Sequence, residues 1–434
     1  MSHMHDLKIL VPLHTLPDVR SVTTIFFESL LSVLKTKVNV HIVWLVYTPE
    51  RIDLTNLNYL NSTVLDIHNY KNALEVIQKE KPDLIYAYAA WNFIDHAFSS
   101  TAKILNIPVF CIVHADYSGY IKEAEKNITS NINRFFQNSV PTDQLQNEKK
   151  IMKRGRFFLY KYFFLLKTML AIKKNRLQTI FTIWKFVFLD KLDFRFGSET
   201  IQFLENENLK KQRLSLGFKE SNLIVTGNPM YDSLFFTLQN LQLESTKNNK
   251  FNILLVTTAL YEHGIWTKKQ RDFAIKETLK QLKNIKDLNL TVKIHPSSEI
   301  LSEYELLVKE IIPNVTIHQK GNVENFINES DLVVSFPASS VLTYALLLKK
   351  PLVVCNYFNM MDFILEKNPT LECNNPSFLL NKMDEIKNSS LNFDENRNNF
   401  IKEFLSPFDG HAKDRICDKI FQSVYKISDD EKYD

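Results

Sequence analysis

The sequence predicts two doubly wound α/β domains, and three observations support that fold class. The chain has 434 residues, which suits two domains of about 200 residues each better than a single core. Apolar residues make up 45% and charged residues 24%, the balance of a globular protein. Continuous apolar strands alternate with amphipathic helices in both halves, as in parallel sheets that helices cover on both faces.

The first half of the chain predicts six strands with helices between them. The strands are expected at Leu7–Leu13, Val38–Tyr47, Asp83–Tyr88, Pro108–Val113, Asp193–Phe196 and Leu223–Thr226. The helices are expected at Thr23–Leu34, Lys71–Lys79, Ile94–Leu105 and Glu199–Leu214. The alternation pauses between residues 149 and 191, which we treat as an insert.

A polar stretch without periodicity, residues 241–250, predicts a linker. The domains are therefore expected at 4–240 and 250–410, with a C-terminal helix and tail over 411–434. Strands in the second half are expected at Asn252–Thr257, Leu290–Ile294, Val315–Gln319, Asp331–Ser335 and Leu352–Cys355. Helices are expected at Lys269–Leu282, Ser302–Ile311, Asn322–Asn328, Ser340–Leu348 and Ala412–Tyr425.

Composition excludes several functional classes. The formal net charge of +4 gives no chain-wide attraction to nucleic acid, and no nucleic-acid partner is expected. Four cysteines without a CxxC pair argue against a zinc ribbon or a disulfide-stapled secreted domain. The eight glycines form neither GxGxxG nor GxxxxGK[ST], so the dinucleotide and P-loop fingerprints are absent. We expect no cofactor and no metal, because HExxH, DxD and His/Cys clusters are also missing.

The insert is strongly basic and aromatic. Residues 149–191 contain twelve Lys/Arg, ten aromatic residues and one acid, Asp190. Charges interrupt every apolar run, so the segment cannot span a bilayer, but it suits the interface of an anionic membrane. The alternative is a pair of buried helices whose lysines reach the solvent. No signal peptide or transmembrane helix is expected, which predicts a cytoplasmic protein held peripherally at the inner face of the cell membrane.

Two constellations in the second domain favour phosphate binding. His295 follows a buried strand directly and Pro296 fixes the exit, so the imidazole, assisted by Lys293, can bind a phosphate or a nucleobase. Ser339 and Ser340 precede a helix whose free N–H groups and dipole attract anions. The alternatives are a structural histidine and a serine that only caps its helix.

Further candidates lie at other strand ends. Gly227 and Asn228 form a turn after a strand, where the glycine lets the backbone approach a ligand. Glu262 and His263 follow the first strand of the second domain.

In the first domain, His14 and His114 each follow a strand, and either imidazole could act as a general base. His114 is favoured because Asp116 lies two residues away.

These motifs together resemble the GT-B glycosyltransferase superfamily. The stretches Lys81–Tyr86, Ile107–Phe110 and Val225–Asp232 are similar to the hydrolysing UDP-N-acetylglucosamine 2-epimerases. The pairs His295-Pro296 and Ser339-Ser340 resemble capsule-type transferases that use CMP-activated acidic sugars, and CDP-glycerol polyolphosphotransferases. In those families these pairs are associated with the nucleotide and its phosphates. The resemblance implies two Rossmann-like domains that face a central cleft, with the aromatic-basic helical insert added.

The chain departs from the epimerases at their acidic positions. Ala89-Ala90 stands where they carry Gly-Asp, and His114-Ala115-Asp116 stands in place of Glu-Ala-Gly. The resemblance therefore implies a metal-independent glycosyltransferase with a nucleotide-sugar donor, CMP- or CDP-activated, and a glycan or lipid-linked acceptor in cell-surface polysaccharide assembly. An epimerase-like isomerase or hydrolase and a non-catalytic membrane-bound scaffold remain the alternatives.

Overall fold

The computed structural model contains two compact units. Unit 1 comprises Met1–Met230 and His411–Asp434, and unit 2 comprises Tyr231–Gly410. The residues described are 6–13, 22–47, 62–87, 93–113, 160–172, 177, 180–181, 200–215, 217–241, 251–262, 264–296, 299–360, 362–368, 371–388 and 390–425. The predicted strand Asp193–Phe196 lies outside them.

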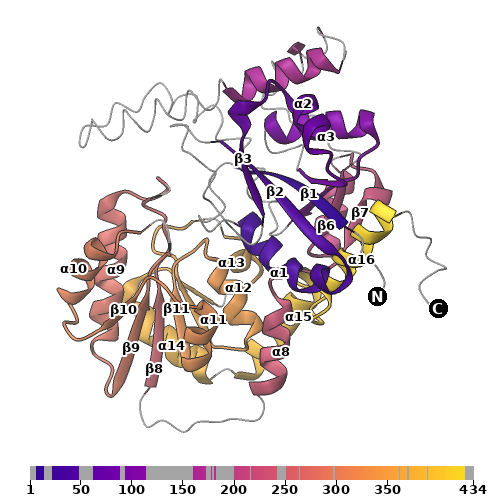
Figure 1. Cartoon of the computed structure of the whole chain (residues 1–434). Helices are drawn as coiled ribbons and strands as arrows, with labels where there is room; N and C mark the ends of the chain where they lie inside the picture. Colours follow the sequence, from indigo (N-terminus) through magenta and orange to yellow (C-terminus); the bar gives the residue numbers. More distant parts are fainter. Residues whose placement is uncertain are drawn as a thin grey trace, which may run out of the picture. The chain divides into compact units, whose positions relative to one another are not determined.

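Unit 1 is built on a parallel sheet (Figure 1). Within the described residues its strand order is β3-β2-β1-β4-β5-β6-β7. The strands are β1 (Asp6–Leu13), β2 (Asn39–Val46), β3 (Thr63–Asp66), β4 (Leu84–Tyr86), β5 (Val109–Val113), β6 (Ile201–Leu204) and β7 (Leu223–Val225). The helices are α1 (Val22–Lys37), α2 (Ala73–Glu80), α3 (Phe93–Leu105), α7 (Glu207–Ser215) and α16 (Ala412–Tyr425).

Helices cover both faces of this sheet because its strands carry apolar residues on both sides. Phe27 of α1 and Ile416 of α16 pack with Trp44 on one face. Ile77 of α2 and Phe98 of α3 pack with the other face. Burial on both sides explains why the strands are continuous apolar runs, and it confirms the predicted α/β fold class.

One predicted helix of unit 1 is wrong in its first half. The sequence predicts a helix over Glu199–Leu214, whereas Ile201–Leu204 forms strand β6 and the helix α7 begins only at Glu207. Phe203 is 1% exposed, and β6 is paired with β5 and β7 along its length. Tertiary pairing therefore decided the conformation of a short segment that local periodicity left ambiguous. The four-residue strand β3 was also not predicted.

Unit 2 contains a second parallel sheet, with strand order β10-β9-β8-β11-β12-β13 among the described residues. The strands are β8 (Phe251–Val256), β9 (Leu288–Lys293), β10 (Thr316–His318), β11 (Leu332–Ser335), β12 (Leu352–Cys355) and β13 (Glu372–Cys373). The helices are α8 (Asp232–Leu241), α9 (Lys268–Leu282), α10 (Leu301–Lys309), α11 (Val323–Glu329), α12 (Ser340–Leu347), α13 (Phe363–Lys367), α14 (Leu379–Asn388) and α15 (Ser390–Phe404).

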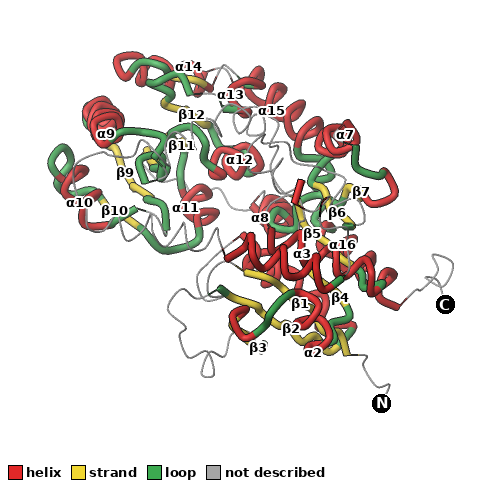
Figure 2. The backbone as a smooth tube through the Cα atoms, turned by 90° about the horizontal axis from the view of Figure 1, so that it is seen from above, coloured by secondary structure: helices red, strands yellow, loops and turns green. Residues whose placement is uncertain are grey.

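The helices of unit 2 are also divided between the faces of their sheet (Figure 2). Leu279 of α9, Tyr304 of α10 and Met383 of α14 pack with Leu255 in one core. On the other side, α12 contacts β11, β12, α8 and α15, and α11 contacts β8. The helices α13, α14 and α15 were not predicted from the sequence.

The boundary between the units differs from the predicted linker at 241–250. Helix α8 belongs to unit 2, because the Tyr231 ring meets Tyr344 at 5.6 Å and Phe235 meets Phe408 at 5.5 Å. The chain leaves unit 2 after Gly410, and α16 returns to the core of unit 1. The predicted C-terminal helix Ala412–Tyr425 is therefore part of the first sheet's cover rather than a separate segment.

Part of the basic-aromatic insert is described. Residues 160–171 are helical, and one side of that helix enters the core of unit 1, where Phe164, Leu165 and Met169 are at most 3% exposed. The opposite side keeps Phe163 and Leu170 at 51% and 41% exposure. This helix therefore has apolar residues on two sides, one buried in the core of unit 1 and one exposed.

Candidate functional site

The strand order of unit 2 indicates where a ligand would enter. The order β10-β9-β8-β11-β12-β13 reverses direction between β8 and β11. In open doubly wound sheets, ligands bind beyond the carboxyl ends of the strands at such a switch point. In this unit Thr257 follows β8, Phe336 follows β11, and His295 lies beyond the adjacent strand β9.

His295 and the serine pair lie at the same edge of this sheet. All pairings among β9, β8 and β11 are parallel, so their carboxyl ends share one edge. Only β8 separates β9 from β11, which sets the two strand ends about 10 Å apart at the usual strand spacing. The two predicted phosphate-binding elements therefore belong to neighbouring positions around the switch point.

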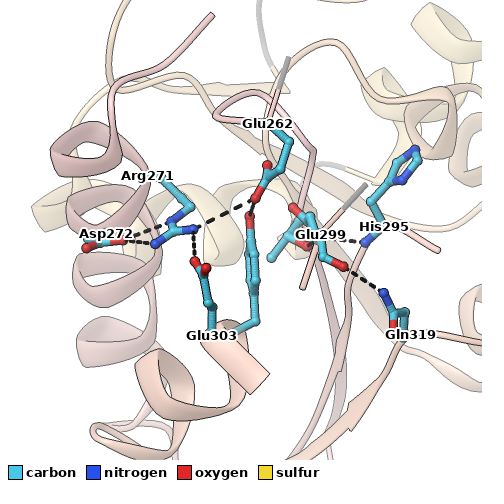
Figure 3. A network of polar contacts seen from close by, with 9 residues as sticks. Glu262, Arg271, Asp272, His295, Glu299, Glu303 and Gln319 are labelled. Atoms are coloured by element: carbon cyan, nitrogen blue, oxygen red, sulfur yellow. Dashed lines mark hydrogen bonds and ion pairs between the residues drawn. The ribbon is translucent and has the colours of Figure 1, made fainter. Parts of the chain in front are cut away.

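The backbone around His295 is held by buried side chains (Figure 3). Glu299, which is 2% exposed, accepts the His295 N–H and the Thr257 hydroxyl on Oε2, each at 2.5 Å. The Gln319 side-chain amide donates to the backbone oxygen of Glu299 at 2.7 Å. The ends of β8 and β9 are thereby tied together, while the imidazole of His295 points away from the Glu299 carboxyl (Figure 3).

The Lys293 side chain forms hydrogen bonds within the protein. It is buried, and Nζ donates to the backbone oxygens of Ile294 at 3.0 Å and Gln319 at 2.8 Å. The ammonium group therefore fixes the carboxyl end of β9 from within. Pro296, the next predicted residue, is exposed.

Glu262 belongs to a polar network beside this segment. Its Oε1 accepts the Tyr304 hydroxyl at 3.0 Å and lies 3.8 Å from Nη1 of Arg271. Arg271 is also paired with Glu303 at 3.0 Å and Asp272 at 2.8 Å. Figure 3 shows that this network runs from α9 towards the Glu299 carboxyl.

Burial shifts the pKa values of two groups in this network, Glu299 and Tyr304. Burial raises the pKa of Glu299, although the Thr257 hydroxyl, the His295 amide and the neighbouring Tyr304 phenol lower it in part. Burial followed by the two neighbouring carboxylates raises the pKa of Tyr304, so its phenol keeps its proton.

The entrance to α12 offers backbone donors. Ser339 is the N-cap, and its Oγ accepts the Val341 N–H at 3.2 Å. The Leu342 N–H donates to the Ser339 carbonyl, also at 3.2 Å. Within the described residues, the N–H groups of Ser339 and Ser340 donate to no acceptor, and Ser340 is exposed. These two groups remain available to an anion at the positive end of the helix.

Gly227 and Asn228 lie just before the boundary between the units. Gly227 has φ of +81°, the left-handed conformation that favours glycine. Asn228 is 5% exposed, and its Oδ1 accepts the Met230 N–H at 3.0 Å. Arg415 of α16 donates to the Thr226 carbonyl through Nε at 2.9 Å and Nη2 at 2.7 Å. The turn is therefore fixed against the returning C-terminal helix.

The predicted acceptor-side residues His14, His114 and Asp116 lie outside the described residues, as does His263. Among the residues that the structure describes, no group of three His, Cys, Asp or Glu side chains is arranged to hold a metal ion. Likewise, no described helix is both long and apolar enough to cross a bilayer.

Sequence reasoning missed Thr257, Glu299 and Tyr304. Thr257 is the last residue of the predicted strand Asn252–Thr257, and Glu299, four residues after His295, belongs to no recognisable motif. These side chains belong to the candidate site because they are buried beside His295 and hydrogen-bond to one another, to its backbone or to Glu262 beyond the ends of β8 and β9.

The fold class that these units define is GT-B: two Rossmann-like α/β units, each on a parallel sheet. No protein-family model matches the chain, and no curated protein matches it.

Solved structures of this fold are similar over almost the whole chain. MnaA of S. aureus, solved with UDP, has 16% identity and a TM-score of 0.54, covering 97% of this chain and 98% of its own. The UDP-GlcNAc 2-epimerase of Neisseria meningitidis, bound to UDP-GlcNAc, has 14% identity and a TM-score of 0.53, with 96% and 100% covered. The wall teichoic acid polymerase TagF, soaked with CDPG, has 13% identity and a TM-score of 0.52, with 97% and 89% covered. At these identities the likeness establishes the fold.

Proposed function

We propose that the protein is a metal-independent glycosyltransferase that moves a sugar from a CMP- or CDP-activated donor to a glycan or lipid-linked acceptor in cell-surface polysaccharide assembly. The observation that carries the proposal is the common edge shared by His295 and the Ser339-Ser340 helix start, on either side of strand β8. Similar structures with nucleotide ligands, including MnaA with UDP and TagF with CDPG, support a nucleotide donor.

The donor phosphate would be held by neutral and positive groups. The bond between the sugar's anomeric carbon and the phosphate oxygen breaks in the reaction, and the departing phosphate gains negative charge. The N–H groups of Ser339 and Ser340, the α12 dipole and the His295 imidazole would offset that charge without a metal. Gly227, Asn228 and Lys293 would support the donor side, the lysine by fixing the carboxyl end of β9.

The acceptor side is proposed from the sequence. A hydroxyl of the acceptor would attack the anomeric carbon while His114, or else His14, takes its proton. Asp116 would orient the imidazole of His114. Substitution His114→Ala should lower turnover and leave nucleotide affinity nearly unchanged, whereas full activity in this variant would exclude His114 as the base.

Nucleotide titration tests the donor site. We expect CMP, CDP or UDP to raise the melting temperature of the wild type, because a ligand that binds the folded state stabilises it. His295→Ala should weaken that binding by about tenfold or more, the usual effect of losing a hydrogen bond to a charged group. His411→Ala is the matched control, since His411 is an exposed histidine of unit 1 that contacts Asp414 at 3.1 Å. Equal affinity in both variants would remove His295 from the donor site.

The same preparation separates the alternatives. An epimerase-like enzyme would convert UDP-N-acetylglucosamine to free N-acetylmannosamine and UDP without an acceptor, whereas a transferase would not. A non-catalytic scaffold would show no thermal shift with any of the three nucleotides.

We propose further that the 149–191 insert holds the protein on the anionic inner face of the cell membrane. Phe163 and Leu170 are exposed on one side of the helix spanning 160–171, and Lys167 lies exposed between them. Leu177, Ile180 and Phe181 are exposed as well. Apolar side chains interleaved with lysine suit the boundary between lipid headgroups and acyl chains.

A further inference from the structure

The loop that follows β9 is organised around one buried carboxyl group. Glu299 Oε2 receives two donors, the Thr257 hydroxyl and the His295 N–H, each at 2.5 Å. The same residue's backbone oxygen accepts the Gln319 side-chain amide at 2.7 Å. A single side chain thus joins the end of β8 to the backbone of the histidine that we assign to the donor site.

The other oxygen of this carboxyl group lacks a donor. Oε1 of Glu299 is buried and accepts no hydrogen bond. The neighbouring Tyr304 hydroxyl has one proton, and it donates that proton to Glu262 Oε1 at 3.0 Å. An ionised carboxylate with a buried, unpartnered oxygen is costly, whereas a proton on Oε1 would remove the charge and could be donated to the Tyr304 oxygen.

The charges around the pair favour that placement of the proton. Glu262 also has a buried oxygen without a donor, Oε2, but a cation lies 3.8 Å from its Oε1: Arg271, which also binds Asp272 and Glu303. The Lys293 ammonium group donates to the backbone oxygens of Ile294 and Gln319. The negative charge of the two glutamates is therefore best accommodated on Glu262, and burial raises the pKa of Glu299 in the same sense.

We propose that Glu299 is the positioning residue for His295 and acts as a neutral acid. It stands at the end of a chain of polar contacts in which the Tyr304 hydroxyl donates to Glu262 and Glu262 forms an ion pair with Arg271. The inference rests on the proposed donor site. A neutral Glu299 fixes the His295 backbone without setting a negative charge beside a bound phosphate. An ionised one would fix the same backbone but would repel the phosphate.

Two variants of Glu299 separate neutral positioning from simple packing. Glu299→Gln keeps an oxygen acceptor for Thr257 and the His295 N–H and resembles the uncharged acid. Its amide can donate to the Tyr304 oxygen, as the proposed proton does. Glu299→Ala removes the acceptor. We expect the glutamine variant to keep nucleotide affinity within about twofold and the alanine variant to lose about tenfold.

Hydrogen exchange gives a readout that needs no nucleotide. Peptides that contain the His295 amide should exchange at the wild-type rate in Glu299→Gln and faster in Glu299→Ala. Glu303→Gln is the control, because Glu303 is an exposed carboxylate that contacts Arg271, at the end of the polar network away from Glu299. Should the wild type bind no nucleotide, the proposed donor site fails, while the exchange rates still decide the role of Glu299.

The pH profile tests the neutral state directly. Wild-type nucleotide affinity should fall relative to that of Glu299→Gln as the pH rises and Glu299 ionises. If Glu299→Gln matches Glu299→Ala in exchange and affinity, or if the wild type and the glutamine variant have parallel pH profiles, the proposal is overturned. Should the alanine variant fail to fold, this comparison of wild type with Glu299→Gln remains decisive.

Discussion

Asp362 fixes the turn that precedes the serine-capped helix by accepting the Ala338 N–H on Oδ2 at 2.7 Å. Ala338 has φ of +59°, a left-handed conformation that is uncommon for a residue with a Cβ. The other oxygen of Asp362 caps α13 by accepting the N–H groups of Ile364 and Leu365. One carboxylate therefore connects two helix starts, and within the described residues the next N–H groups, of Ser339 and Ser340, have no acceptor.

Substitution of the cap can separate helix capping from anion binding. Aspartate is as good an N-cap as serine, so Ser339→Asp should preserve stability, whereas Ser339→Ala should cost about 1 kcal/mol. The added carboxylate should nevertheless repel a phosphate and lower nucleotide affinity by about tenfold. Urea denaturation and nucleotide titration measure the two effects separately.

The control for this substitution is Asn72→Asp at the N-cap of α2 in unit 1, where Asn72 Oδ1 accepts the Glu75 N–H at 3.0 Å. It changes a cap and a charge in the same way, away from α12. Ser340→Ala should leave stability within about 0.5 kcal/mol, because Ser340 is exposed and is not the cap. A Ser339→Asp variant that binds nucleotide as tightly as the wild type would contradict phosphate binding at this helix.

The raised pKa of Glu299 predicts a pH dependence of stability. Between its ordinary value of 4.5 and its higher folded value, the folded state keeps a proton that the unfolded state has lost. The free energy of unfolding should therefore decrease as the pH rises through this window. Glu299→Gln cannot titrate, so its stability relative to the wild type should increase as the pH rises from 4.5 through the raised pKa of Glu299. Denaturation curves of both proteins at constant ionic strength measure this difference, and a constant difference would indicate an ordinary pKa.

Membrane association can be tested on the exposed side of the insert helix. The double variant Phe163→Ser, Leu170→Ser should reduce binding to vesicles that contain phosphatidylglycerol by about tenfold, because two half-exposed apolar side chains no longer enter the interface. Leu306→Ser is the matched control, since Leu306 is 76% exposed on α10 of unit 2. Co-sedimentation at low and high salt, with neutral vesicles for comparison, measures the effect. A wild type that stays in the supernatant at low salt would rule out the interfacial role.

Much of the fold could be predicted because buried strands leave a strong pattern. The strand Leu352–Cys355 and the helix Ala412–Tyr425 were predicted with the bounds that the structure has. The segment Ile201–Leu204 was not, because four residues with mixed polarity fit a helix as well as a strand until β5 and β7 lie beside them. Helix α16 could be predicted as a helix, but its return to unit 1 depends on Ile416 and Cys417 finding a place in a distant core.

The candidate site shows the same division. Sequence alone could propose His295 and Ser339 as site residues, because residues that follow predicted strands lie at the edge of a parallel sheet where ligands bind. Glu299 and Tyr304 belong to the site only through burial and contacts with Thr257 and Glu262.

The sequence by itself determined two parallel α/β units and the strand ends where chemistry is expected, because periodicity and strand termini are local properties. The tertiary structure alone decided that α8 belongs to unit 2, that α16 belongs to unit 1, and that a buried glutamate holds the histidine backbone. These features depend on contacts between residues that are far apart in the sequence, and a local sequence pattern carries no information about such contacts.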